Sequence, residues 1–176
     1  MFFFMGSNIS SIRIIKDFPK KGINFYDIGS LLSNPQEFKK AINMMTLMTK
    51  KMKPTAIAGI DSRGFIFASI IAYSLKLKLI IIRKKGKLPG KIYSNSYKLE
   101  YGTNTLEIQK DFLNSKDTVI IIDDVFATSG TMNASCKLVK KTNAKVAGAV
   151  VLIELSFLKG REKLKYNLQS LLKINT

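Results

Sequence analysis

The chain has 176 residues, 46% of them hydrophobic, and its 29 Lys and Arg against 12 Asp and Glu give a formal net charge of +17. This length suits one domain with a sizeable core, and no Pro/Gly/Ser-rich linker divides it, so we expect a single domain over residues 1–176. The absence of histidine excludes the commonest general base, Ser-His and Cys-His nucleophile pairs, and the usual zinc sites.

Cysteine usage and hydropathy indicate the compartment. The single cysteine, Cys136, excludes an internal disulfide and fits a reducing environment. The apolar start MFFFMGSN lacks a basic flank and is too short for the apolar region of a signal peptide. No apolar run reaches the length of a membrane span. We therefore expect a cytoplasmic protein that does not enter membranes.

The positive charge favours polyanionic partners: nucleic acid, an acidic membrane or a phosphorylated small molecule. The alternative is compositional drift, because Lys, Ile and Asn dominate the sequence as they do in proteins of AT-rich genomes. The lysines are scattered along the chain rather than massed on one segment. We prefer drift to a nucleic-acid surface.

Taken in chain order, residues 1–30 lack a regular pattern, and turn residues around Pro19 and Gly22 predict a loop, an N-terminal hood that packs over another part of the protein. A helix is predicted over residues 35–51, with Asn34 as its N-cap. Continuous apolar strands are predicted at 55–60, 79–83, 118–123 and 145–155, and helices at 65–75 and 131–142. Continuous apolar strands are typical of parallel sheets covered on both faces. The alternation therefore predicts an α/β fold with a mainly parallel central sheet flanked by helices.

Residues 86–110 differ from this pattern because they are polar and rich in tyrosine and glycine. Tyr93, Asn95, Tyr97 and Leu99 alternate with smaller or charged residues, which predicts a hairpin that turns near residues 101–102. Long ordered loops in compact domains are often active-site lids. We expect a flexible hairpin lid, and the alternative is a surface hairpin without a role.

Polar clusters follow three of the predicted strands, at residues 61–64, 83–87 and 123–131. Ligands bind at the carboxyl ends of the strands in an open parallel sheet. Residues 128–131, Thr-Ser-Gly-Thr, precede a helix whose N-terminus favours a phosphate group, and the lysine of a Walker loop is missing. Asp123 and Asp124 suit sugar hydroxyls or a nearby Mg²⁺. The segment therefore predicts a site for a ribose 5-phosphate.

The stretch VIIIDDVFATSGT resembles the phosphoribosyl pyrophosphate motif of the type I phosphoribosyltransferase family. With GIDSRGF, IRKKGKLPG, SYKLEYGTNTLEIQKD and LKGREKL it resembles, more narrowly, the adenine phosphoribosyltransferases, from about Ile12 to the end of the chain. The resemblance implies purine salvage: phosphoribosyl pyrophosphate and adenine give AMP and pyrophosphate, with Mg²⁺. It also implies a homodimer.

Carried over by position, the resemblance assigns the 5-phosphate to Ala127, Thr128, Ser129, Gly130 and Thr131. It places Asp123 and Asp124 at the ribose hydroxyls and the developing positive charge, with Mg²⁺ bound to them directly or through water. It gives the pyrophosphate leaving group to Arg63 and to the backbone around Asp61 to Gly64, with further positive charge from Arg83, Lys84 and Lys87.

The resemblance also assigns roles in the predicted lid, where Glu100 would handle proton transfer at the base and Tyr101 would close over the site. The residues alone favour a solvated hairpin acid at Glu100. The alternative for Arg63 is a surface salt-bridge partner, for which a short turn between strand and helix is a poor place, and the alternative for the Lys84–Lys85 pair is a solvated run. Breaking the sugar–pyrophosphate bond requires cations at the leaving group and a lid that excludes water, but no covalent nucleophile. A chain without histidine can meet these requirements.

The sequence departs from the family pattern at three positions. Ser129 stands where the phosphate loop usually has glycine, which constrains the backbone. Tyr26 stands where an arginine near adenine is usual, and Lys21 replaces a proline. Stacking by Phe25 or Tyr26, with backbone hydrogen bonds, would then read the base.

Two other functions are compatible with the sequence. One is transfer to another purine base, such as xanthine or hypoxanthine, against which the lid sequence argues. The other is a phosphoribosyltransferase-like regulator that binds nucleic acid through the positive charge. The chain shows neither a helix-turn-helix nor an aromatic-rich RNA motif, so nucleic acid is not the partner that we expect.

Overall fold

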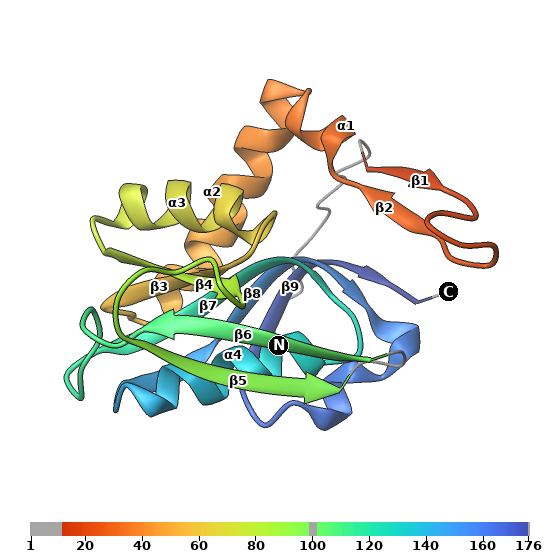
Figure 1. Ribbon diagram of the computed structural model, residues 1–176. Helices are drawn as coiled ribbons and strands as arrows, with labels where there is room; N and C mark the ends of the chain where they lie inside the picture. Colours follow the sequence, from red (N-terminus) through yellow and green to blue (C-terminus); the bar gives the residue numbers. More distant parts are fainter. Residues whose placement is uncertain (1–11, 99–101, 176) are drawn as a thin grey trace. The chain divides into compact units, whose positions relative to one another are not determined.

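The computed structural model describes residues 12–98 and 102–175 (Figure 1). The chain packs as two compact units, Met1–Met44 and Met45–Thr176, and the boundary falls inside helix α2 (Pro35–Lys51). The single-domain organisation stays a prediction. Among the described residues, no helix combines the length and apolarity needed to cross a membrane.

In the first unit, β1 (Arg13–Ile15) and β2 (Phe25–Asp27) pair antiparallel, so the prediction of a loop without secondary structure was wrong here. Each strand has three residues, which is too short for alternation to be recognised. The predicted turn does exist: the Gly22 N–H donates to Asp17 Oδ1 at 2.6 Å. The short helix α1 (Gly29–Leu32) follows.

Helix α2 begins as the sequence predicted. Pro35 occupies the first helical position, and the N–H of Glu37 donates to Asn34 Oδ1 at 3.1 Å, which confirms the predicted N-cap. Met45, Met48 and Thr49 are buried near its end, at the spacing of one helical face.

The second unit is built on a sheet whose described strands run in the order β5-β6-β4-β3-β7-β8-β9. Strands β4, β3, β7, β8 and β9 are parallel, and β6 and β5 add an antiparallel hairpin at one edge. This confirms the mainly parallel sheet. The strand bounds are Ala56–Ile60 (β3), Lys78–Lys84 (β4), Ile92–Lys98 (β5), Thr103–Gln109 (β6), Thr118–Phe126 (β7), Lys145–Leu155 (β8) and Leu168–Ile174 (β9).

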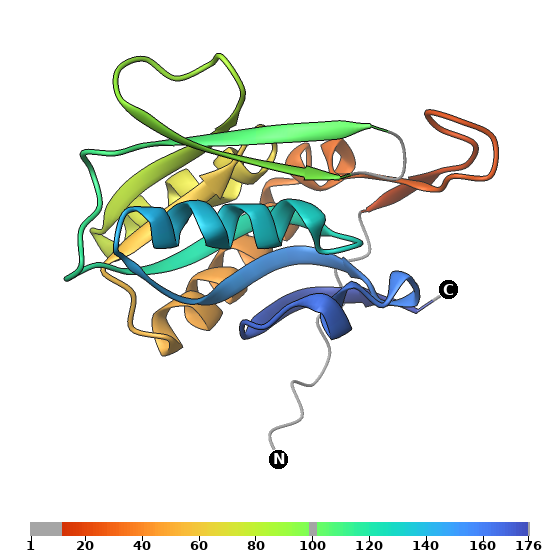
Figure 2. The same ribbon diagram turned by 60° about the horizontal axis from the view of Figure 1, so that its bottom comes forward.

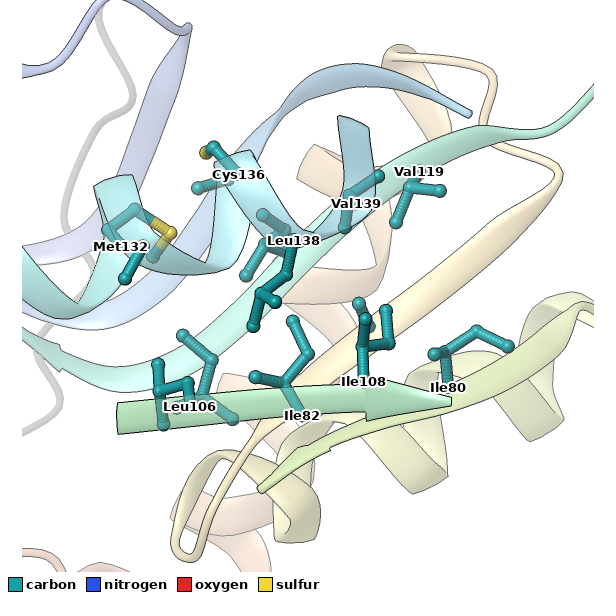
Figure 3. Packing of buried hydrophobic residues seen from close by; sticks show 14 of the residues in the cluster. Ile80, Ile82, Leu106, Ile108, Val119, Met132, Cys136, Leu138 and Val139 are labelled. Carbon is teal, nitrogen blue, oxygen red and sulfur yellow. The ribbon is translucent and has the colours of Figure 1, made fainter. Parts of the chain in front are cut away.

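Two helices cover opposite faces of this sheet (Figure 1). Helix α3 (Gly64–Leu75) connects β3 to β4, and α4 (Gly130–Lys141) connects β7 to β8. The central strands β3, β7 and β8 are buried on both sides and read as continuous apolar runs for that reason. On the α4 face, the buried side chains shown in Figure 3 include Met132, Cys136, Leu138 and Val139 of α4 over Ile80, Ile82, Leu106, Ile108 and Val119 of the sheet.

Cys136 belongs to this core and is 1% exposed. Burial raises the pKa of its thiol to about 12, so the neutral thiol is the only significant form near neutral pH. Because the thiolate is the nucleophile, we expect no measurable labelling of the native protein by a thiol reagent at pH 8, and complete labelling after denaturation. Mass spectrometry of both samples checks this, and rapid native labelling would show that α4 separates from the sheet.

The β5–β6 hairpin confirms the hairpin predicted from the tyrosine alternation, with Tyr97 paired to Asn104 and Lys98 to Thr103. The hairpin and α4 lie side by side (Figure 2). Lys141 Nζ at the end of α4 donates to the Ser94 carbonyl oxygen of β5 at 2.6 Å, and Tyr93 and Tyr97 pack against the core.

Candidate active site

The strand order places the polar clusters at a change of direction in the sheet. From β3 the chain passes through α3 to β4 on one side, whereas β7 pairs with β3 on the other side and leads through α4 to β8. The carboxyl ends of β3 and β7 therefore flank a topological switch point, where open α/β sheets bind ligands. The predicted gathering of residues 61–64, 83–87 and 123–131 at one edge is confirmed.

The predicted phosphate loop joins β7 to α4 and encloses a pocket. Asp123 and residues 125–132 line this pocket, so all five residues predicted for the 5-phosphate border it. Helix α4 starts at Gly130, and the first N–H groups of a helix have no intrahelical carbonyl to bond. These donors and the positive end of the helix dipole suit a phosphate dianion.

Ser129, the unusual residue of the loop, has φ 76° and ψ −12°, a left-handed conformation. This conformation explains why glycine is usual here, since a side chain costs about 1 kcal/mol in it. Asn133 supports the serine: its Nδ2 donates to Ser129 Oγ and to the Lys163 carbonyl oxygen, both at 3.1 Å. The loop is thus tied to α4 and to the C-terminal segment. The sequence did not reveal Asn133, although its i+4 spacing from Ser129 was a signal.

The C-terminal motif LKGREKL, residues 158–164, packs against the same loop. A Cβ at Gly160 would collide with the Ala127 carbonyl oxygen, and would lie 3.0 Å from the Ala127 carbonyl carbon. Arg161 donates from Nε and Nη2 to the two oxygens of the buried Glu154 at 2.8 and 2.5 Å. This bidentate pair lies at the end of β8, and it fixes the turn that brings Gly160 to the loop. Sequence reasoning assigned no function to this tail.

The two acids of β7 point to different surroundings, as successive residues of a strand do. Asp123 lines the pocket, and its Oδ1 accepts the N–H of Asp124 at 2.9 Å. Asp124 is buried and pairs with Arg63 through Nε and Oδ2 at 2.8 Å. Burial raises the pKa of Asp123, and the neighbouring Asp124 carboxylate raises it further. Asp123 therefore holds its proton to higher pH than a free aspartic acid does.

Gly64 makes this approach of α3 to β7 possible. A Cβ at Gly64 would lie 2.9 Å from Asp123 Oδ1 and 2.9 Å from the Ile122 carbonyl oxygen. The motif GIDSRGF therefore carries a glycine at position 64 because the first turn of α3 lies against the end of β7. Arg63, one residue earlier, reaches Asp124 from this position.

The cations predicted for pyrophosphate follow β4. Arg83 Nε and Lys87 Nζ lie 3.3 and 3.8 Å from Asp61 Oδ2, and the Lys84 side chain is exposed. The guanidinium carbon of Arg83 lies 6.0 Å from the centre of the Phe65 ring, a cation–π contact. The ends of β3 and β4 thus carry a positive cluster built around one carboxylate.

The hairpin also reaches the phosphate loop. The hydroxyl oxygens of Tyr97 in β5 and Thr131 in α4 lie 3.0 Å apart, a hydrogen bond in which either can donate. Glu100 and Tyr101, the two predicted lid residues, lie outside the described residues. Phe25 and Tyr26 belong to the first compact unit, where Phe25 is half-buried and Tyr26 is buried. Their predicted contact with adenine stays a prediction.

Comparison with known proteins agrees with this arrangement. The phosphoribosyl transferase domain model matches residues 27–175. An adenine phosphoribosyltransferase of Rhodospirillum rubrum is 46% identical over 91% of this chain and 94% of its own length. The chain belongs to the adenine phosphoribosyltransferase family.

Solved structures of the family share the fold. The crystal structure of adenine phosphoribosyltransferase from Thermoanaerobacter pseudethanolicus superposes with a TM-score of 0.91 at 43% identity and covers 94% of this chain and 96% of that one. The Saccharomyces cerevisiae enzyme, complexed with an imino-altritol bisphosphate and adenine, has a TM-score of 0.89 at 36% identity, with coverage of 93% and 95%. The type I phosphoribosyltransferase fold predicted from the sequence is therefore confirmed.

Proposed function

We propose that this chain is an adenine phosphoribosyltransferase of purine salvage, which transfers the 5-phosphoribosyl group of phosphoribosyl pyrophosphate to adenine and releases AMP and pyrophosphate. One observation carries the proposal. A pocket at the N-terminus of α4, lined by a carboxylate, lies at the same sheet edge as the cations that follow β3 and β4. A molecule with a phosphate at one end, a diol in the middle and a pyrophosphate at the other end fits this sequence of groups.

The residues divide the chemistry among them. Residues 127–131 hold the 5-phosphate through N–H groups and hydroxyls. Asp123 faces the ribose, where it exchanges hydrogen bonds with a hydroxyl and, when ionised, stabilises the positive charge that develops on the sugar. Arg63 and Arg83 stabilise the negative charge that develops on the pyrophosphate, and Lys84 and Lys87 add to the positive potential there. The ribose role of Asp124 requires that Arg63 turn towards the ligand.

The donor groups present fit Mg²⁺ only as an ion bound together with the substrate. The described residues hold no cluster of three or more acidic, cysteine or histidine side chains that could hold a metal by themselves. Mg²⁺ typically uses one or two carboxylates and substrate phosphate oxygens, and Asp123 and Asp124 offer the carboxylates. Bound in this way, Mg²⁺ would supply neutralising charge to the pyrophosphate.

Base recognition and lid closure complete the proposal. Phe25 and Tyr26 read adenine by stacking and through backbone groups, Glu100 handles the proton at the base, and Tyr101 excludes water. Family membership supports these roles, a cytoplasmic location and a homodimer. Light scattering of the purified protein tests the homodimer.

The purified chain is expected to form AMP when it is given Mg²⁺, phosphoribosyl pyrophosphate and adenine. Separate reactions contain hypoxanthine, guanine or xanthine, and product nucleotides are resolved by chromatography. Product from another base only would overturn the adenine assignment and keep the reaction class. No nucleotide from any base, with salt-dependent binding of RNA or DNA instead, would favour a regulator.

A further inference from the structure

Asp61 directly follows β3, and the sheet fixes its position. Its N–H donates to the Ile82 carbonyl oxygen at 2.9 Å, which extends the parallel ladder in which Ile60 pairs with Ile82. The Asp61 side chain is only 3% exposed. The next residue of β4, Arg83, is therefore held beside a buried carboxylate by the register of the two strands.

Three donors from the end of β4 gather on one oxygen of this carboxylate. Asp61 Oδ2 lies 3.3 Å from Arg83 Nε, 3.4 Å from the N–H nitrogen of Lys84 and 3.8 Å from Lys87 Nζ. A tight charge-assisted hydrogen bond would measure about 2.7–2.9 Å. Asp61 thus holds these groups nearby, but the distances are longer than those of tight hydrogen bonds that would occupy their N–H donors.

The exposures of the charged groups show where the cations face. Arg83 and Lys87 are 31% and 48% exposed, whereas Asp61 is buried beneath them. Arg83 has further supports, because its Nη1 donates to the Lys87 carbonyl oxygen at 3.3 Å and its guanidinium lies over the Phe65 ring. The cations therefore form a layer between a buried negative charge and the solvent at the sheet edge.

We propose that Asp61 is a positioning residue for the pyrophosphate end of the substrate: its buried carboxylate holds Arg83, the Lys84 N–H and Lys87 in place for a diphosphate anion. This inference rests on the proposed function, since it deepens the role of the β4 cations. In this role the Asp61 carboxylate acts through those cations rather than by its own contact with the ligand.

Two opposing electrostatic effects decide how Asp61 changes the binding of an anion. A buried carboxylate cannot be hydrated, so it keeps cations close to it; without it, the positive charges repel one another and the long side chains spread into solvent. Against this, a negative charge near the site repels a bound anion. Asp61 is buried behind the cation layer, so we expect the ordering of the cations to outweigh the repulsion.

The test is the affinity for inorganic pyrophosphate, measured by calorimetry with Mg²⁺ for the wild type and Asp61→Asn. Asn keeps the size and removes the charge, and we expect binding to weaken by about tenfold. Asp61→Glu restores the charge and is expected to recover most of that loss. For Asp61→Asn in the AMP assay, we expect the KM for phosphoribosyl pyrophosphate to rise by a larger factor than kcat falls. Should Asp61→Asn not fold, Asp61→Ser removes the same charge.

Asp117→Asn is the matched control. Asp117 is also buried, and both of its oxygens accept Lys78 Nζ at 2.9 Å, but it precedes β7 at the opposite end of the strands. We expect the Asp117→Asn variant to lose stability without a change in its affinity for pyrophosphate. Unchanged or tighter pyrophosphate binding by Asp61→Asn would overturn the inference, as would a wild type that binds no pyrophosphate. A wild type that binds pyrophosphate but forms no AMP would overturn the proposed function alone. The pyrophosphate affinities of the wild type and Asp61→Asn would then still test the role of Asp61.

Discussion

The Gly160→Ala variant is expected to lose about 10²-fold in kcat/KM for phosphoribosyl pyrophosphate. The added methyl group would collide with the Ala127 carbonyl oxygen and lie 3.0 Å from Phe126 Cε1. Both obstacles belong to the phosphate loop or to the strand that leads into it, and a backbone carbonyl cannot rotate away as a side chain does. The loop must therefore move, and its N–H groups lose the geometry that a phosphate requires.

Stability should fall in the same variant, because forcing an extra methyl group into a packed site costs about 1–3 kcal/mol. Steady-state kinetics with varied phosphoribosyl pyrophosphate and urea denaturation measure the two effects. Lys163→Ala is the control: its side chain is exposed in the same 3₁₀ segment, Gly160–Lys163, and only its backbone accepts a bond from Asn133. Near-wild-type kinetics for Gly160→Ala would mean that the tail does not position the loop.

The central sheet was predictable because its strands carry a strong local signal. Residues 118–123 and 145–155 are apolar without interruption, and the structure places β7 and β8 there, buried on both faces. Helix α4 overlaps the predicted range 131–142, where Met132, Cys136 and Val139 recur at helical spacing, and these residues are buried. The polar ends of the strands then had to meet, since parallel neighbours end at the same edge.

The parts that the sequence did not predict depend on contacts between distant residues. The β1–β2 pair has no periodicity of its own, because three-residue strands exist only through their pairing. The collision that makes Gly160 necessary joins residues more than thirty positions apart, and nothing near Gly160 in the sequence indicates Ala127. The sequence predicted no role for the Asp61 side chain beyond membership of the polar cluster at residues 61–64, because that role depends on which strand lies beside β3.

Ser129 shows the same limit within one motif. The sequence identified the substitution of a loop glycine, and general principles gave its conformational cost. The support that Asn133 provides became clear only from the bond to Ser129 Oγ and the second bond to the Lys163 carbonyl oxygen. A local departure from a family pattern is thus compensated by a group one helical turn later and by the C-terminal segment.

Arg63→Ala is expected to reduce AMP formation by about 10²–10³-fold, the loss typical when one stabilising donor is removed from an active site. In the resting protein Arg63 pairs with the buried Asp124 at 2.8 Å and is 38% exposed, so it can turn towards an incoming anion. The variant removes the cation from the pyrophosphate and leaves Asp124 without this partner. We therefore expect kcat to fall, and stability to fall by about 1–3 kcal/mol because the pair is only partly buried.

Lys78→Ala separates these two consequences. It removes the cation of another buried carboxylate, Asp117, at a similar distance of 2.9 Å, but at the far end of the strands from the pocket. Thermal denaturation should show comparable losses of stability for both variants, whereas AMP formation at a temperature where both are folded should fall for Arg63→Ala alone. Equal turnover in the two variants would reduce Arg63 to a structural partner of Asp124. Arg63→Lys refines the result: a point charge that restores stability without restoring kcat would show that the planar guanidinium is required at the leaving group.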